Sequence, residues 1–360
     1  MDSGESHLGS LVWTAVEPSA LSTLSSEWDE LVAGAGYPAF MRAPFLKNAI
    51  STFGCAGGRL LLARRETSLV AGGVLVPCGM GRWSTYQPSQ LPLGCWVMSR
   101  DLQWESILPC VLRELPGLPI SVSFTQQDPH LVTRPTSDGC LETLDYVATG
   151  WVNVCGKFGD FWQARGKNLR HNLRKQRRRL EEAGNTLAFE FVDRPSDIDL
   201  AFLQFVVIEN AGWKSTEGTS IAIENEQGAF YRAMLNEFAA QGAAFAIRLR
   251  LNGKPIAVDF GIRDSESLIL LKTTYDENLR EYSPAQLLHE QTFEYVFRNS
   301  SARRVEFYGR MMEWHSRWTE QSRMLFHVNV YRSPLLRRAR DFVKWAQRRA
   351  QRARVQVVGD

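Results

Sequence analysis

The chain has 360 residues, 44% hydrophobic and 22% charged, which are the values of an ordinary globular protein of about two domains. Charged residues at 64–66 interrupt the most apolar segment, residues 60–77, so no stretch reaches the roughly 18 apolar residues that a transmembrane helix needs. The formal net charge of +3 combines +8 over residues 332–354 with −5 over the rest, so the tail is expected to attract an anionic surface, either membrane or nucleic acid.

The first half of the chain predicts a strand, a helix, a hairpin, a second helix and two more strands. In chain order these are residues 11–16, 19–33, 59–64 with 68–77, 101–115, 120–124 and 141–147. Leucine, tryptophan and valine recur at helical spacing over 19–33, and Pro18 stands where the first turn of a helix favours proline. Gly72-Gly73, in the second arm of the hairpin, indicates a bulge.

The second half repeats this order of elements. It predicts helices over 195–211 and 224–240, strands over 244–251, 255–262 and 268–275, a helix over 284–298, and strands over 304–308 and 327–331. Asn252-Gly253 joins two of these strands and is the strongest short signal for a hairpin. The matching elements are about 180 residues apart, so we predict two similar α/β domains, residues 1–150 and 151–331, with a ligand cleft where they meet.

Residues 332–360 are predicted to form a separate basic amphipathic helix. Between Leu335 and Ala353 the apolar residues share one face, with arginine and lysine opposite. Two such faces are typical of a helix that lies on an anionic membrane, here through residues 335–354. The alternative is a C-terminal helix that packs its apolar face on the body of the protein and leaves its basic side in solvent.

Cysteines and the N-terminus indicate the compartment. None of the six cysteines forms a CxxC pair or lies near a histidine at metal-ligand spacing, so the sequence predicts no metal site. Residues 1–10 lack the basic and apolar regions of a secretory signal. We therefore expect a cytoplasmic protein with reduced thiols, peripheral to the inner face of the membrane where its tail binds.

A strongly basic helix is predicted at residues 165–182, where eight basic residues precede the first acidic one. Its less polar residues share one face: Leu169, Leu173, Gln176 and Leu180. Arginine binds phosphate with two parallel hydrogen bonds, so Arg170 and Arg174 near the helix start are candidates for contacts with an anion. The alternative is a solvent-exposed helix face.

The strand at 268–275 leads through a short loop into a helix that begins at Ser283-Pro284. Serine is a favoured N-cap and proline a favoured first helical residue. Free backbone N–H groups and the helix dipole make such a start a candidate anion site; the alternative is an ordinary capped helix. The chain has neither of the glycine-rich fingerprints of dinucleotide-binding and P-loop proteins.

Two further segments carry side chains that could take part in chemistry. The strand that ends at Tyr308 contains Glu306, and His315 follows between two tryptophans. An imidazole titrates near neutral pH and can accept a proton. Trp213-Lys214 lies in the loop after a helix. For the histidine and for the loop pair, the alternative is a structural role.

Together these pieces resemble the acetyltransferase domain of CelD-like polysaccharide-biosynthesis proteins, in the branch of the GNAT superfamily that includes the FemAB transferases. The resemblance covers about half of the chain. It rests on the order and spacing of six segments: the basic helix, Trp213-Lys214, Lys254–Ala257, Tyr275-Asp276 with Tyr282–Pro284, Glu306–Gly309 and Trp314–Trp318. It implies two tandem GNAT-like domains, the first degenerate, each a mixed sheet flanked by helices.

The sequence departs from the family pattern at three positions. Ala285 stands where glycine is usual after Ser283-Pro284, Glu306 replaces an aspartate, and Trp314-His315 replaces a Tyr-Lys pair. An alanine at the helix start limits how closely a phosphate can approach the backbone. The change at residue 315 removes a fixed positive charge.

The resemblance implies direct N-acyl transfer from acetyl-CoA or another acyl-CoA to an amine on a sugar or polysaccharide precursor. The donor is expected beside the strand 268–275 and the helix start that follows it. Candidate donor contacts are Lys272, Tyr275, Tyr282, Ser283, Ala285 and Gln286, with Arg170 and Arg174. Candidate acceptor contacts are Trp213, Lys214, Trp314 and Trp318.

Four residues are candidates for proton transfer. Glu306 or His315 is the expected base, and Tyr308 is a candidate acid. Asp259, inside an apolar strand, is a further candidate, with Lys272 on the neighbouring strand as its expected partner. The alternatives are a FemAB-like transferase, which takes its acyl group from an aminoacyl-tRNA bound by the basic helix, and a degenerate GNAT domain that acts as a scaffold.

Overall fold

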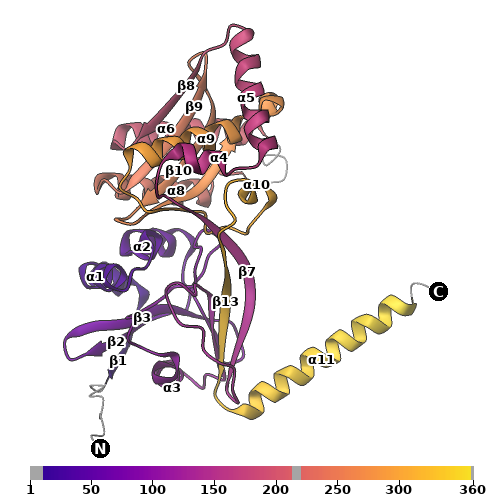
Figure 1. Cartoon of the computed structure of the whole chain (residues 1–360). Helices are drawn as coiled ribbons and strands as arrows, with labels where there is room; N and C mark the ends of the chain where they lie inside the picture. Colours follow the sequence, from indigo (N-terminus) through magenta and orange to yellow (C-terminus); the bar gives the residue numbers. More distant parts are fainter. Residues whose placement is uncertain (1–10, 213–219, 358–360) are drawn as a thin grey trace, which may run out of the picture.

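The computed structural model describes residues 11–212 and 220–357. Its strands form one sheet that runs through both halves of the chain, with helices packed against it (Figure 1). The strands are β1 Leu11–Val16, β2 Arg59–Arg65, β3 Ser68–Pro77, β4 Arg82–Thr85, β5 Trp96–Met98, β6 Ser121–Gln127, β7 Leu141–Asn153, β8 Leu187–Val192, β9 Ala244–Leu251, β10 Lys254–Arg263, β11 Ser267–Tyr275, β12 Arg304–Glu306 and β13 Ser322–Tyr331. Their order is β1-β2-β3-β4-β6-β13-β7-β12-β11-β10-β9-β8, with β5 beside β3.

Helices flank this sheet, and the mixed sheet with flanking helices confirms the predicted α/β fold class. The α-helices are α1 Ser25–Ala35, α2 Ala43–Phe53, α3 Trp104–Glu114, α4 Phe158–Gln163, α5 Lys167–Glu182, α6 Pro195–Ala211, α8 Glu226–Ala240, α9 Pro284–Asn299, α10 Glu313–Ser316 and α11 Pro334–Val357. Three 3₁₀ turns, η1 Pro18–Ser22, η2 Ala39–Met41 and η3 Glu277–Tyr282, lie between them.

The two halves share the order of their first strands, as the internal repeat predicts. β1, β2 and β3 pair antiparallel in that order, and β8, β9 and β10 do the same. Among the described residues, α1 and α2 stand between the first strand and the hairpin of the first half, and α6 and α8 stand between those of the second half. α2 packs against α8, so the helical layers of the two halves meet.

Two long strands join the halves. β7 pairs with β13 over Leu141–Gly150 and with β12 over Trp151–Asn153. β13, near the end of the chain, lies between β6 and β7. Residues 322–331 therefore complete the sheet of the first half. The division of the chain into domains at residue 150 remains a prediction.

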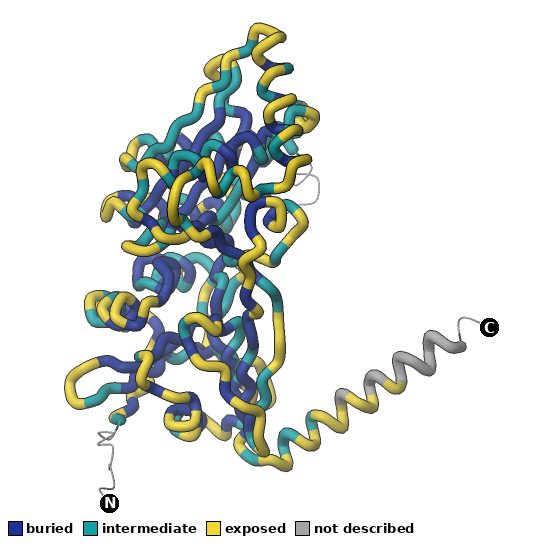
Figure 2. Tube along the Cα trace, viewed as in Figure 1, coloured by how far each residue is buried: buried dark blue, intermediate teal, exposed yellow. Residues whose placement is uncertain are grey.

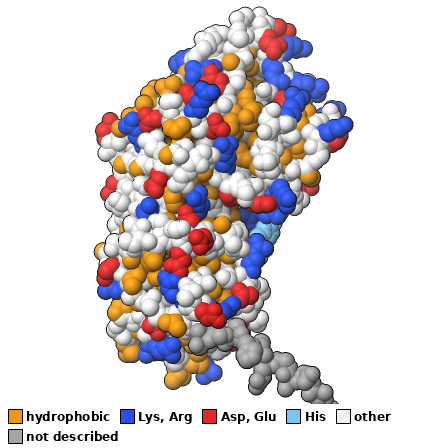
Figure 3. All heavy atoms as spheres, turned by 90° about the vertical axis from the view of Figure 1, so that its left-hand side faces the viewer, with side chains coloured by type: hydrophobic (Ala, Val, Ile, Leu, Met, Phe, Trp, Pro, Cys, Tyr) orange, Lys and Arg blue, Asp and Glu red, His pale blue; other side chains and the backbone are white. Residues whose placement is uncertain are grey.

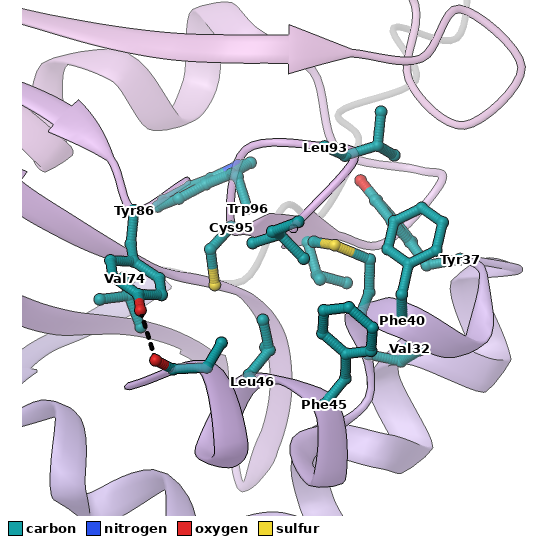
Figure 4. Close-up of a cluster of buried hydrophobic side chains, with 14 of the residues drawn as sticks. Val32, Tyr37, Phe40, Phe45, Leu46, Val74, Tyr86, Leu93, Cys95 and Trp96 are labelled. Atoms are coloured by element: carbon teal, nitrogen blue, oxygen red, sulfur yellow. Dashed lines mark hydrogen bonds between the residues drawn. The ribbon is translucent and has the colours of Figure 1, made fainter. Parts of the chain in front are cut away.

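The core of the first half combines aliphatic side chains with aromatic ones (Figure 4). Phe40 and Phe45 pack edge to face, with ring centroids 6.2 Å apart. The buried Tyr86 hydroxyl donates a hydrogen bond to the carbonyl of Ala49, at 2.8 Å. Phe45 also contacts Phe230 of α8, at 5.1 Å between ring centroids, so this core continues into the second half.

The hairpin of the second half turns as predicted. Asn252 and Gly253 have φ values of 51° and 80°. A two-residue turn of this kind needs positive φ at both positions, because its twist then matches the twist of the flanking strands.

The second arm of the first-half hairpin bulges as predicted, but two residues before Gly72-Gly73. Ala71 is opposite Ala63 and Leu69 is opposite Arg64, so Val70 is the extra residue. The glycines instead permit close packing, since a Cβ on Gly73 would lie 2.3 Å from the carbonyl oxygen of Cys95. The glycine pair in this strand therefore marks a place where the backbone of a neighbouring segment packs closely against it.

Other predicted elements differ in detail. The helix expected over 19–33 is divided into η1 and α1, and α2 and β8 have no predicted counterpart. α5 agrees closely with its prediction, since it buries Leu169, Leu173, Gln176 and Leu180, the face expected from the spacing.

The C-terminal helix α11 extends away from the body of the protein (Figures 1 and 2). Its first turns contact β7, where Arg337 donates to the Leu141 carbonyl at 2.8 Å and Arg340 pairs with Glu142. Leu335 and Phe342 are 71% and 65% exposed, so the apolar face is not packed on the body. No helix within the described residues is both long and apolar enough to cross a membrane.

The body surface contrasts with this helix in charge. On the face shown in Figure 3, acidic side chains lie beside basic ones over most of the surface. Residues 332–354 contain nine basic residues against one acidic residue. Positive charge is thus concentrated in the segment that stands apart from the body.

Candidate active site

A cleft opens where two parallel strands separate. β11 and β12 pair only over Ser267–Ile269 and Arg304–Glu306. Beyond these residues a cleft of about 600 Å³ lies between β11, the start of α9 and the segment that follows β12. This volume is typical of small-molecule sites. Five of the predicted donor contacts line it: Lys272, Tyr275, Ser283, Ala285 and Gln286.

The helix start at this cleft has an unusual backbone. Ser283 ends η3 and is the N-cap of α9, with φ 55° and ψ 51°. The position of the cap is as predicted, but the Ser283 hydroxyl caps no N–H, because side-chain capping requires an extended N-cap backbone. Ser283, Gln286 and Leu287 donate their N–H groups to the carbonyls of Arg280 and Ser283. Pro284 has no N–H, so the Ala285 N–H is the group that this helix start offers to an anion, together with the helix dipole. Arg280 lines the cleft beside it.

Aromatic side chains form the opposite wall. Phe307 and Trp314 line the cleft and pack edge to face, with ring centroids 5.6 Å apart. Trp318, a predicted acceptor contact, is instead fully buried. Its indole N–H donates to Gln286 Oε1 at 2.9 Å, so Trp318 anchors the first turn of α9.

His315 lines the cleft, and its hydrogen bond defines its tautomer. The Met312 backbone N–H donates to His315 Nδ1 at 3.0 Å. A neutral imidazole that accepts at Nδ1 carries its proton on Nε2. Burial lowers the pKa of His315 to about 4, so the ring is neutral at pH 7. Its free nitrogen is thus a hydrogen-bond donor, which suits stabilisation of a developing oxyanion better than proton acceptance.

A second histidine, His289 of α9, also lines the cleft and contacts Asp259 of β10. The two side chains are 2% and 0% exposed, and His289 Nε2 lies 3.5 Å from Asp259 Oδ2. Burial raises the pKa of Asp259 to about 7, an effect that the Thr273 hydroxyl partly opposes. Burial, and secondarily the charge of His315, lowers the pKa of His289 to about 3. Both shifts favour the uncharged side chains.

The partner that the sequence predicts for Asp259 lies elsewhere. Lys272 is paired in register with Phe260, whereas Asp259 is opposite Thr273. The Lys272 ammonium lies over the ring of Tyr231, 5.6 Å from its centroid. Side chains alternate across a sheet, so this one-residue offset places Lys272 and Asp259 on opposite faces.

Glu306 and Tyr308 line a different cavity, of about 650 Å³, that faces the first half. There Arg323 of β13 pairs with Asp128 at 2.8 Å and with Glu306 at 2.9 Å. Burial raises the pKa of Glu306, and the Arg323 guanidinium opposes this rise. Burial also raises the pKa of Tyr308 well above its usual value. Since its carboxylate is already paired, Glu306 belongs to a buried ionic network between the halves.

The basic helix α5 stands beside the mouth of the cleft. Arg179 pairs with Glu281 of η3 at 3.0 Å and lies over the ring of Tyr282, which is outside the cleft lining. Arg170 and Arg174 are also outside the lining. Arg174 is exposed. Arg170 donates to the Arg165 carbonyl and to Gln163 Oε1, so of these arginines Arg179 is the one held against η3 beside the cleft.

The structure divides the predicted site residues into groups. Those that it brings together in the cleft are Lys272, Tyr275, Ser283, Ala285, Gln286, Trp314 and His315. Those that it places elsewhere are Asp259, beneath the cleft, Glu306 and Tyr308, in the second cavity, and Tyr282, Arg170, Arg174 and Trp318. Trp213 and Lys214 lie outside the described residues.

Sequence reasoning missed His289. Its position, five residues after the proline that starts α9, places it on the buried face of that helix, in a row with Leu288 and Phe293. Polar residues at core positions of this helix, His289 with Glu290 and Thr292, are the signal that could have found it. Among the described residues, no group of three or more His, Cys, Asp or Glu side chains is placed to hold a metal ion.

Comparison with known proteins bears on this site. The sequence matches the family of acetyltransferase (GNAT) domains over residues 167–316, which contain α5, the cleft and both histidines. A comparison with curated protein sequences gives no match.

Several solved structures share the fold over nearly the whole chain. The C-terminal domain of a protein described as a lysylphosphatidylglycerol synthetase, from Agrobacterium fabrum, is 12% identical, with 86% of this chain and 92% of that domain covered and a TM-score of 0.57. FemX is 8% identical, with 89% of this chain and 97% of the FemX chain covered and a TM-score of 0.55. A protein of unknown function from Bacteroides thetaiotaomicron is 9% identical, with 90% of this chain and 100% of that protein covered and a TM-score of 0.53. The chain therefore has a GNAT and FemAB-like fold, and its residues 167–316 match the GNAT acetyltransferase domain family.

Proposed function

We propose that the chain is an N-acyltransferase that takes an acyl group, most simply acetyl, from acyl-CoA and transfers it to an amine of a sugar or polysaccharide precursor. The separation of β11 from β12 above the start of α9 carries this proposal. A thioester bound along β11 would lie with its anionic end at the helix start. The sugar acceptor rests on the resemblance to CelD-like proteins.

The residues of the cleft fit such a donor. The Ala285 N–H and the dipole of α9 offer a site for an anion at the helix start, with Arg280 beside them. Tyr275 and Lys272 lie along the strand, and apolar side chains from β11 and the opposite wall line the remainder. Ala285 lines the cleft and adds one methyl group at the helix start. The donor supplies an activated carbonyl; the chain supplies position and hydrogen bonds.

Within this proposal, His315 donates its Nε2–H to the carbonyl oxygen as negative charge develops on it. The roles predicted from the sequence, with Glu306 or His315 as base and Tyr308 as acid, are tested by Glu306→Gln and His315→Ala. If kcat/KM falls by less than about tenfold in both variants, that assignment is refuted, because removal of a general base lowers the rate by about 10²-fold or more. His315→Gln keeps a donor, so it separates donation from proton acceptance.

Calorimetry with acetyl-CoA and longer acyl-CoAs tests the proposed donor. Ser283→Asp places a carboxylate at the anion site, in a left-handed position that aspartate tolerates, and it is expected to abolish binding. Ser22→Asp, on the exposed end of η1 in the first half, is the matched control and should bind as the wild type does. Absence of binding by every acyl-CoA would instead favour an aminoacyl-tRNA donor or a non-catalytic scaffold.

A second candidate function is aminoacyl transfer from tRNA. The observation that favours it is the position of α5, whose exposed basic face stands beside η3 at the cleft mouth. FemX and the lysylphosphatidylglycerol synthetase domain share the fold. Binding of a charged tRNA should weaken by roughly 0.7 log unit per phosphate contact for each tenfold rise in salt, whereas acyl-CoA binding should respond less.

We further propose that α11 binds an anionic membrane. Leu335, Phe342, Val343 and Trp345 are exposed, and the segment carries nine basic residues. An exposed apolar face with opposing positive charge fits the interface of an anionic bilayer. Deletion of residues 335–360 should abolish binding to phosphatidylglycerol vesicles. Phe342→Gln keeps the charge and should weaken binding, and unchanged binding after the deletion would refute the proposal.

A further inference from the structure

His289 and Asp259 are a buried polar pair in an apolar environment. Asp259 lies among the apolar residues of β10, and His289 packs between Trp314, whose ring centroid is 5.0 Å away, and Trp318, at 6.3 Å. Neither ring nitrogen of His289 has a hydrogen bond with good geometry to a described residue. Two buried polar side chains that make no hydrogen bond of good geometry within the described chain are costly, so their presence at the cleft indicates a function.

The contact with Asp259 distinguishes the two ring nitrogens of His289, both of which are buried. His289 Nε2 lies 3.5 Å from Asp259 Oδ2, so once Asp259 is a carboxylate it favours the neutral ring with its proton on Nε2. Nδ1 then carries the lone pair. This arrangement, a carboxylate behind an imidazole whose other nitrogen can accept a proton, is the one that orients general bases in acyl-transfer enzymes.

The other polar groups of the cleft are less suited to this task. The titratable groups around the pair are Lys272 and Tyr275 on β11, Arg280 of η3 and His315 of α10. An ammonium or guanidinium group has no lone pair to offer. His315 already accepts the Met312 N–H at Nδ1.

We propose that His289 is the proton acceptor of the transfer and that Asp259 positions it. This inference rests on the proposed acyltransferase function. The acceptor nitrogen forms a bond to the acyl carbon, and its proton passes to His289 Nδ1. The bond from the acyl carbon to sulfur then breaks, and the proton passes from His289 to the departing sulfur. The products are an amide and a thiol, and His289 is again neutral.

Burial sets the pH range in which the pair is ready. The pKa of Asp259 is raised to about 7, and that of His289 is lowered to about 3. The step requires a neutral imidazole that faces a carboxylate. The carboxylate forms as the pH rises through about 7, so kcat/KM should rise over the same range.

Kinetics with acetyl-CoA as donor and glucosamine as acceptor tests these roles. His289→Ala should lower kcat by about 10²-fold or more without weakening donor binding, and added imidazole should restore part of the rate. Asp259→Asn should lower kcat and leave only the rise of kcat/KM that deprotonation of the acceptor amine itself produces near pH 7. The matched control is His171→Gln, an exposed histidine of α5, and it should behave as the wild type.

A measurement that needs no acceptor complements the kinetics. The ¹⁵N shifts of the imidazole, assigned by comparison with His289→Gln, should report a protonated Nε2 and a bare Nδ1 in the wild type. A bare Nε2 would overturn the inference. An active wild type with an active His289→Ala variant would also overturn it and leave the acyltransferase function standing. A wild type that neither binds nor uses any acyl-CoA would refute the proposed function itself.

Discussion

Replacement of Asp259 by asparagine should stabilise the folded protein, and the gain should grow as the pH rises. In the native state the pKa of the Asp259 carboxyl is about 7, against 3.8 for an exposed aspartate. Between these values the native state holds a proton that the unfolded chain has lost. The free energy of unfolding therefore falls as the pH rises from about 4 to 7, because a rise in pH favours the state that binds fewer protons, here the unfolded chain.

The size of this effect follows from the shift. A difference of about 3 pKa units, at about 1.4 kcal/mol each, corresponds to a cost of about 4 kcal/mol once the carboxylate is charged in both states. At pH 5 only about 1.5 kcal/mol of this cost is present, because the native carboxyl is still protonated. Asparagine has the same shape and carries no charge. The stability difference between the variant and the wild type should thus grow by roughly 2–3 kcal/mol from pH 5 to pH 8.

Urea denaturation of both proteins at pH 5, 6, 7 and 8 measures this difference. Asp160→Asn, at an exposed position of α4, is the matched control and should show no comparable pH dependence. Stability curves of the wild type and Asp259→Asn that run parallel across this range would refute the reasoning. Such a result would mean that the buried carboxyl is charged in the native state already at pH 5, for example in an ion pair with His289.

Three further predictions concern packing and pairing. Gly73→Ala places a Cβ 2.3 Å from the Cys95 carbonyl oxygen, so it should destabilise the first half by about 1–3 kcal/mol in urea. Arg323→Met leaves the buried Glu306 carboxylate without its guanidinium; a loss of about 3–5 kcal/mol is expected by thermal unfolding, and an unchanged midpoint would contradict the ionic network. Trp318→Phe removes the indole N–H that holds the first turn of α9, so calorimetry should show weaker acyl-CoA binding with little change in fold.

Much of the architecture was predictable because it rests on local patterns. The face of α5 follows from residues spaced three and four apart, and Asn252-Gly253 allows few backbone conformations other than a tight turn. The cleft residues around Ser283 were also predictable, since strand, loop and helix start are adjacent in sequence.

The proton-transfer residues depend on contacts that no local pattern encodes. Asp259 meets His289 because α9 packs on β10, and the partner expected from strand adjacency, Lys272, is one residue out of register with it. Glu306 is turned toward the first half by its bond to Arg323. Arg323 belongs to β13, whose neighbouring strands come from residues near 125 and 145. No local sequence pattern in any of these strands indicates such a long-range pairing.

The position of β13 constrains how the protein is made. β6 and β7 do not pair with each other; each pairs with β13, which separates them by two strand spacings, roughly 10 Å. A nascent chain that has emerged only through residue 153 thus has two open strand edges and a gap between them. Open edges of this kind favour aggregation, and pairing across some 200 residues is slow. Residues up to 331 must therefore be synthesised before β6 and β7 reach their native pairing.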